Sequence, residues 1–170
     1  FIKWNPSIKF PEDRDALWKA LLDDRLDVIA TDHAPHQKSE KRNTYFKAPA
    51  GGPLVQHSLV AMLDFYHDKK ISLERIVEKM CHAPAQCFKI KDRGYIREGY
   101  KADMVLVDLK KPWKVDTDNI LYKCGWSPFE GHEFKSSVCK TFVSGQLAYD
   151  EGAFSDKRPG ERLLFKGGDR

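Results

Sequence analysis

The chain has 170 residues, 41% of them hydrophobic and 32% charged, with a formal net charge of +4. This composition is typical of a soluble globular protein, and no apolar run is long enough to predict a membrane span or a secretory signal. The basic residues are spread thinly beside acidic ones and lack interleaved aromatic residues, so we expect no nucleic-acid partner and no membrane partner.

The first elements predict a strand, a helix and a second strand. Residues 1–4 resemble the end of a strand, which Asn5 and Pro6 terminate because a residue before proline is restricted to extended geometry. Acidic residues followed by apolar residues at helical spacing predict a helix over 12–22. An apolar strand over 26–31 follows. Two strands joined by a helix within about thirty residues are expected to be parallel neighbours.

A long segment without periodicity comes next. It covers 33–53, and a loop of about twenty residues inside a compact domain suggests a functional role. Helices are then predicted over 55–66 and over 72–80, where a serine stands at the expected N-cap. Proline 84 is expected to interrupt the second of these, with one more helical turn over 84–88.

Beyond residue 91 the pattern changes to short alternating runs. Strands are predicted at residues 95–96, 104–109, 138–143 and 147–149, with Ser144 and Gly145 as the turn of a hairpin. We therefore predict three regions, which are strands and helices over 1–91, a β-domain over 92–157, and a loosely held tail over 158–170 that is rich in charge and glycine.

The strand at 26–31 ends in the motif with the most chemical information. Residues 30–36 read ATDHAPH, and Lys41 follows. In a parallel α/β fold, sites are built where strands end. A carboxylate such as Asp32 can bind a divalent metal and accept a proton from metal-bound water. The alternative is structural: Asp32 ends the strand by accepting backbone hydrogen bonds, and His33 and His36 are surface residues.

This motif resembles the second signature of the dihydroorotases, which belong to the metal-dependent amidohydrolase superfamily. Residues 3–7 (KWNPS) resemble the family's asparagine-proline segment, and residues 47–51 (KAPAG) resemble its substrate loop. Three further segments are similar to the superfamily's carboxy-terminal β-domain: residues 94–96, 99–103 and 127–131. The resemblance therefore covers most of the chain.

The resemblance implies an α/β fold, namely the carboxy-terminal portion of a (β/α)8 TIM-type barrel followed by a small β-sandwich domain. A complete barrel needs about 250 residues, so the chain is expected to be part of a longer enzyme. The missing amino-terminal part of that enzyme is then an expected partner, and a homodimer is a family expectation. Alone, the 170 residues are expected neither to turn over substrate nor to hold zinc tightly.

The resemblance also implies roles for individual residues. Asp32 would be a zinc ligand and the catalytic acid/base, in a binuclear Zn²⁺ site whose other ligands lie upstream. Asn5, His36 and the backbone of Ala50 and Gly51 would bind the substrate. The implied reaction is the reversible hydrolysis of the cyclic amide of dihydroorotate to N-carbamoyl-L-aspartate, a step of de novo pyrimidine biosynthesis.

Two alternatives remain at the level of the sequence. Allantoinases and hydantoinases carry the Asp-His pair but generally lack a histidine at the position of His36. Some dihydroorotase-like chains are non-catalytic scaffolds for aspartate carbamoyltransferase. His33 is not a ligand in the family, and we interpret His57 and Trp126 as structural. The cysteines form no Cys-x-x-Cys pair, which favours free thiols and a cytoplasmic location.

Overall fold

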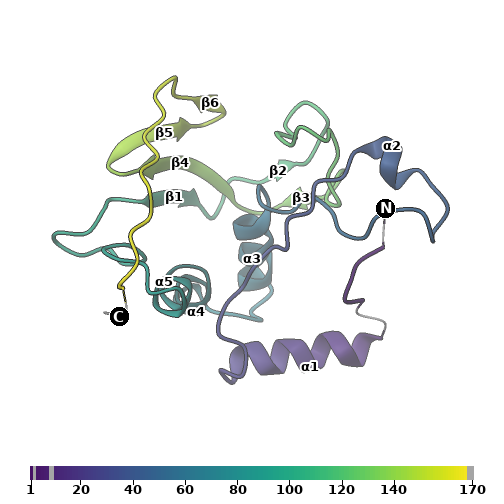
Figure 1. Ribbon diagram of the computed structural model, residues 1–170, viewed down its shortest axis with the longest axis horizontal. Helices are drawn as coiled ribbons and strands as arrows, with labels where there is room; N and C mark the ends of the chain where they lie inside the picture. The colour runs from purple at the N-terminus through teal and green to yellow at the C-terminus, as the bar shows by residue number, and fades with distance from the viewer. Residues whose placement is uncertain (2, 8–9, 168–170) are drawn as a thin grey trace.

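The structure is a computed structural model that describes residues 1, 3–7 and 10–167. The helices are α1 (Pro11–Leu22), α2 (Lys38–Lys41), α3 (Ser58–His67), α4 (Leu73–Val77), the π-helix η1 (Glu78–His82) and α5 (Ala83–Cys87). The strands are β1 (Met104–Asp108), β2 (Trp113–Lys114), β3 (Glu133–Phe134), β4 (Ser137–Val143), β5 (Gln146–Asp150) and β6 (Ala153–Phe154). Figure 1 shows the largest sheet on one side of the molecule and α1, α4 and α5 on the other.

Capping interactions begin the predicted helices close to where the sequence places them. Helix α1 starts with a proline, whose missing N–H costs nothing in the first turn, and the Phe10 N–H donates to the Asp13 carboxylate at 3.1 Å. Ser72 caps α4 as predicted, since its Oγ accepts the Arg75 N–H at 3.2 Å. The helix predicted over 55–66 is present as α3, with its first residue shifted to Ser58.

The predicted interruption at Pro84 is wrong, because α4, η1 and α5 follow one another without a gap. The π turn widens the helix immediately before the proline, and the Ala83 N–H reaches the Glu78 carbonyl. This local widening accommodates a residue that lacks an N–H donor. The Lys79 carbonyl in the same turn accepts the Ile29 N–H at 3.0 Å. The helix is therefore fastened to the segment that leads to Asp32.

The two strands predicted at 1–4 and 26–31 are not strands in the described part of the chain, and Ile2 lies outside it. A parallel strand is defined by the ladder it shares with a neighbour, and no pairing joins the described residues of these two segments. Instead, the Gly51 N–H donates to the Lys3 carbonyl at 2.9 Å, and Gly52 forms a parallel bridge with His33. The glycine-rich loop thus bonds to both segments.

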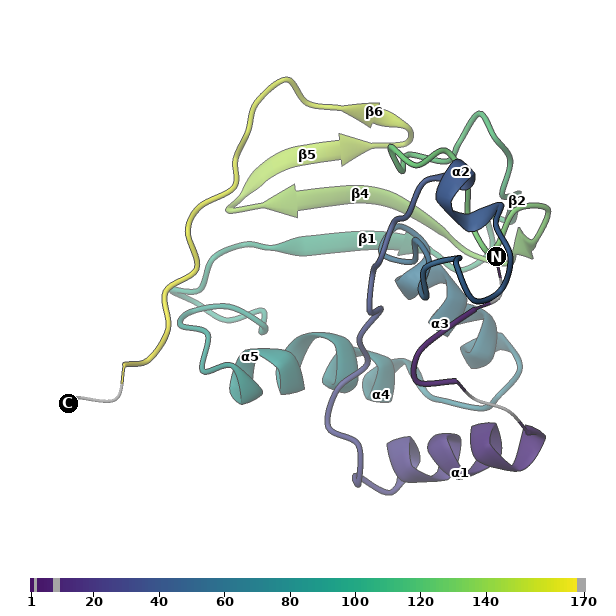
Figure 2. The same cartoon turned by 45° about the vertical axis from the view of Figure 1, so that its right-hand side comes forward.

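The predicted hairpin and its turn are confirmed. Strands β1, β4, β5 and β6 form an antiparallel sheet in the order β1-β4-β5-β6 (Figure 2). Ser144 and Gly145 have φ of 50° and 81°, as a two-residue type I′ turn requires. The strand predicted at 95–96 is wrong, because the Tyr95 ring stacks on His82 at 4.1 Å instead of joining the sheet. The two-residue strands β2, β3 and β6 were not predicted.

Two apolar clusters join the helices to the strands. One contains Leu63 and Ile76, and Val107 of β1 packs against it. The other joins Val60 of α3 to Phe134 of β3. Because both clusters draw on both parts of the chain, the boundary near residue 92 stays a prediction.

Residues beyond 157 also contact the helical region. The Lys91 N–H donates to the Leu164 carbonyl at 2.7 Å, and the Lys166 N–H donates to the Lys89 carbonyl at 2.8 Å.

Within the residues that the structure describes, no helix has both the length and the apolar run that crossing a bilayer requires.

Candidate functional site

Three segments meet beside α2, near the amino terminus of the chain (Figure 2). They are residues 3–5, 32–41 and 48–52, which we call the loop cluster. Backbone hydrogen bonds join them, from the Gly51 N–H to the Lys3 carbonyl (2.9 Å) and from the Ala34 N–H to the Gly52 carbonyl (3.1 Å). All five residues proposed for the site lie in this cluster.

Asp32 presents an exposed carboxylate at the start of the cluster. Its φ of 45° lies in the left-handed region, which aspartate tolerates better than most residues. Among the described residues, none donates a hydrogen bond to this carboxylate. The structural alternative, in which Asp32 accepts backbone bonds at a strand end, therefore finds no donor among the described residues, and the side chain is exposed.

The two histidines of the motif have different surroundings. His33 Nδ1 accepts the N–H groups of Leu54 (3.0 Å) and Val55 (3.3 Å), so its ring holds the segment that leads to α3. An accepting Nδ1 assigns the proton to Nε2. The His36 side chain is half-buried, with Nδ1 at 3.9 Å from Glu40 Oε2. His33 is therefore the supporting member of the pair, and His36 is the one available to a ligand.

The other predicted substrate residues line the same cluster. Asn5 is exposed, Ala50 is half-buried and Gly51 is buried. Gly51 has a φ of 99°, and a Cβ there would stand 2.6 Å from the Ala34 Cβ, so only glycine fits this close approach. In the part of the chain that the structure describes, no hydrogen bond joins the side chains of Asn5, Asp32 and His36 to one another.

Two lysines hold the loop, and the sequence interpretation assigned them no role. Lys41 is 2% exposed, and its Nζ donates to the carbonyls of Pro49 and Gly51, both at 2.8 Å. Burial lowers the pKa of this ammonium, and the nearby Lys3 charge adds to the effect. Lys3 Nζ donates to the carbonyls at 45 and 48, both at 2.8 Å. In the sequence, only the spacing of Lys41 from the ATDHAPH motif indicates a role for these lysines.

Aromatic side chains support the loop cluster. Trp126 and Tyr122 come from the strand region, and His57 lies directly before α3. Trp126 is 3% exposed, and its Nε1 donates to the His36 carbonyl at 2.8 Å. His57 is fully buried, with Nδ1 at 3.2 Å from both Tyr122 Oη and Ser127 Oγ. Burial lowers the pKa of His57 to about 4 and raises the pKa of Tyr122 to about 12. The structural interpretation of Trp126 was incomplete, because its ring nitrogen holds the backbone of a site residue.

The described residues do not by themselves form a zinc site. They contain no group of three or more His, Cys, Asp or Glu side chains that could hold a metal ion. A hydrolytic zinc centre usually takes three protein ligands, and of the proposed ligands only Asp32 belongs to this chain.

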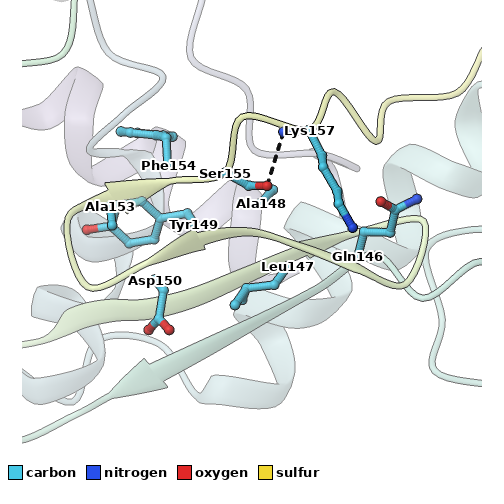
Figure 3. A pocket seen from close by; sticks show the side chains of 9 residues that line it. All are labelled: Gln146, Leu147, Ala148, Tyr149, Asp150, Ala153, Phe154, Ser155 and Lys157. Carbon is cyan, nitrogen blue, oxygen red and sulfur yellow. Dashed lines mark hydrogen bonds between the residues drawn. The ribbon is translucent and has the colours of Figure 1, made fainter.

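Cavities occur both at the loop cluster and far from it. One of about 430 Å³ lies along the hairpin of β5 and β6, where Figure 3 shows Tyr149, Phe154 and Lys157 around it. None of its lining residues belongs to the loop cluster. Another, of about 420 Å³, borders α2 and is lined in part by Trp4 and Trp126. Only the second adjoins the candidate site.

Comparison with known proteins assigns the family. The profile described as "Amidohydrolase family" matches residues 6–148. The chain belongs to the amidohydrolase family. Within it, the dihydroorotase of Pyrococcus furiosus is 37% identical over 166 residues, which are 98% of this chain and 38% of that protein. The dihydroorotase of Halobacterium salinarum is 39% identical over 150 residues, which are 88% of this chain and 35% of that protein.

Solved amidohydrolase structures agree with the fold. The L-hydantoinase (dihydropyrimidinase) of Arthrobacter aurescens superposes with a TM-score of 0.86 at 28% identity, over 95% of this chain and 37% of that one. A D-hydantoinase gives 0.81 at 27% identity, over 89% and 34%. The predicted fold class, part of an α/β barrel of the amidohydrolase type followed by β-strands, is confirmed. The chain spans little more than a third of the length of these relatives.

Proposed function

We propose that this chain is part of a dihydroorotase, which interconverts dihydroorotate and N-carbamoyl-L-aspartate by hydrolysis of the cyclic amide. The observation that carries the proposal is the exposed Asp32 carboxylate, free of protein donors among the described residues, in a cluster that also contains Asn5, His36 and Ala50. Amidohydrolase relatives named dihydroorotase, at 33–39% identity, support this choice of substrate.

In the proposed reaction, Asp32 moves the proton. Its carboxylate accepts a proton from the attacking water and returns it to the ring nitrogen as the amide C–N bond breaks. In the synthetic direction the same group takes the proton from that nitrogen as the ring closes, since acid and base roles exchange on reversal. An exposed carboxylate that accepts no hydrogen bond from the described residues is suited to both steps.

The remaining groups hold the substrate. Dihydroorotate has a carboxylate and ring amides, which require donors and acceptors at fixed positions. Side chains of Asn5 and His36 supply both kinds. The N–H of Gly51 already donates to Lys3, and its carbonyl accepts from Lys41. The Ala50 N–H has no acceptor among the described residues, and we assign it to the substrate.

The proposal extends to zinc dependence, with Asp32 as one ligand and the others supplied by residues of the longer protein outside this chain. It also extends to de novo pyrimidine biosynthesis and to a cytoplasmic location. A hydantoinase-like activity is the second candidate, which the structural similarity to L-hydantoinase favours. The imidazole of His36 distinguishes the two candidate activities, because family members that act on hydantoins generally lack it.

The test is made in the longer protein, with dihydroorotate and hydantoin as competing substrates. Asp32→Ala is expected to lower kcat by about 10³-fold, the scale of a lost general acid/base. Asp27→Ala is the matched control, because Asp27 is exposed in the segment that leads to Asp32. Near-normal turnover by Asp32→Ala, or turnover of hydantoin alone by the unsubstituted protein, would contradict the proposal.

A further inference from the structure

Lys41 is a buried cation without an ion-pair partner in the described part of the chain. A second lysine, Lys79, is equally buried at 2% exposure, but its Nζ lies 2.8 Å from Asp24 Oδ1. Among the described residues, Lys41 Nζ donates to neutral carbonyls, those of Pro49 (2.8 Å), Gly51 (2.8 Å) and Lys3 (3.4 Å), and the Trp126 ring lies 6.0 Å away.

This arrangement constrains the carbonyls as much as it stabilises the ammonium. An unpaired buried charge is expensive unless hydrogen bonds replace its hydration, and an ammonium has three donors to satisfy. Bonds from a charged donor are about twice as strong as neutral ones. The three carbonyls must therefore converge on one point, which sets the orientation of their peptide planes.

The orientation of one plane bears directly on the proposed site. In a trans peptide the carbonyl and the following N–H point in opposite directions. The Pro49–Ala50 peptide is trans, and its carbonyl faces Lys41. The Ala50 N–H must then point away from Lys41, and it meets no acceptor among the described residues. Lys41 thus fixes the direction of this N–H, away from its own ammonium.

The same ammonium joins the segments that carry the other proposed groups. Lys3 lies two residues before Asn5 on the chain, and Lys41 ends the short helix that begins directly after the His36 segment. Gly51 packs against Ala34. One side chain therefore ties together all three segments of the loop cluster.

We infer that Lys41 is a positioning residue of the substrate site, whose ammonium fixes the direction of the Ala50 N–H and the spacing of Asn5 and His36. The identity of the substrate rests on the proposed function. The constraint on the backbone does not, so the two can fail separately.

The first measurement is kinetic and uses the longer protein with its metal bound. Lys41→Met keeps the length of the side chain but removes the donors, and it is expected to raise KM for dihydroorotate about tenfold, the effect of losing a charged hydrogen bond, with metal content unchanged. Lys41→Gln retains an amide donor and is expected to fall between wild type and Lys41→Met. Lys79→Met, the matched control, is expected to lower Tm and leave KM unchanged.

The second measurement is amide hydrogen exchange, which does not depend on activity. In Lys41→Met, peptides that contain Ala34 and Gly51 are expected to exchange about tenfold faster, while peptides of β4 and β5 do not change. Lys79→Met is expected to leave exchange at Ala34 and Gly51 as in wild type. If Lys41→Met fails to fold, Lys41→Gln is compared with wild type in the same way.

The outcomes are distinct. Unchanged exchange at Ala34 and Gly51, or an unchanged KM, would overturn the inference. A wild-type protein that does not turn over dihydroorotate would contradict the proposed function, and exchange would still decide whether Lys41 fixes the loop cluster.

Discussion

The loop cluster and the four-stranded sheet satisfy the hydrogen bonds of their backbones in different ways. In the sheet, strands donate to one another along antiparallel ladders. In the loop cluster, side chains supply much of the bonding: Lys41 and Lys3 donate to loop carbonyls, and Trp126 donates to His36. A ladder survives the loss of most single side chains. The loop cluster depends on a few, so substitutions there should have much larger effects.

The largest effect is expected where the loop cluster packs most closely. Gly51→Ala would place a Cβ 2.6 Å from the Ala34 Cβ, at a φ of 99°, and should lower the free energy of unfolding by about 3 kcal/mol. Gly131→Ala is the control, since Gly131 has a φ of 87° with no atom within 4 Å of the added Cβ. Its cost should be about 1 kcal/mol. Equal losses in urea denaturation would show that packing against Ala34 contributes nothing.

Low pH should lower the free energy of unfolding through His57, which is buried next to the loop cluster. The folded-state pKa of His57, about 4, lies below its ordinary value of 6.5, so the unfolded state binds the proton first as pH falls. Stability is then lost between about pH 6.5 and 4, by up to about 3 kcal/mol. His57→Gln should flatten this dependence, measured by urea denaturation across that range. The same slope in His57→Gln as in wild type would show that the burial of His57 is not its cause.

A smaller effect is expected from the ring nitrogen of Trp126. Trp126→Phe retains an aromatic ring but removes the donor to the His36 carbonyl, and it should cost about 1 kcal/mol of unfolding free energy and raise KM severalfold. Trp113→Phe, which removes the donor to the Ser136 carbonyl (3.0 Å) beside the sheets, should cost a similar amount with KM unchanged. The same KM in both variants would show that Trp126 does not hold the site.

The smallest effect should come from a lysine of the sheet. Lys140 pairs with Asp150 at 2.6 Å between β4 and β5, and both side chains are about 40% exposed. Since exposed ion pairs contribute little, Lys140→Met should change the free energy of unfolding by less than about 1 kcal/mol and leave KM unchanged. A rise in KM as large as the one expected for Lys41→Met would remove the contrast between the two regions.

Local patterns predicted the elements that local forces determine. Helical spacing and the cap at Ser72 placed α4, and Ser144 with Gly145 placed the turn between β4 and β5. The same reasoning failed at residues 95–96, where Tyr95 stacks on His82 from a distant helix. It failed also at Pro84, because a π turn absorbed a residue that usually ends a helix.

The sequence by itself determined α1, α3 and α4, the hairpin and the motif around Asp32, since spacing, capping and turn chemistry act over a few residues. Only the tertiary structure decided how the loop cluster is held. The bond from Lys41 to the Lys3 carbonyl spans 38 residues, and the bond from Trp126 to His36 spans 90. No local pattern encodes such contacts, because they form only when burial brings distant segments together and leaves their polar groups to satisfy one another.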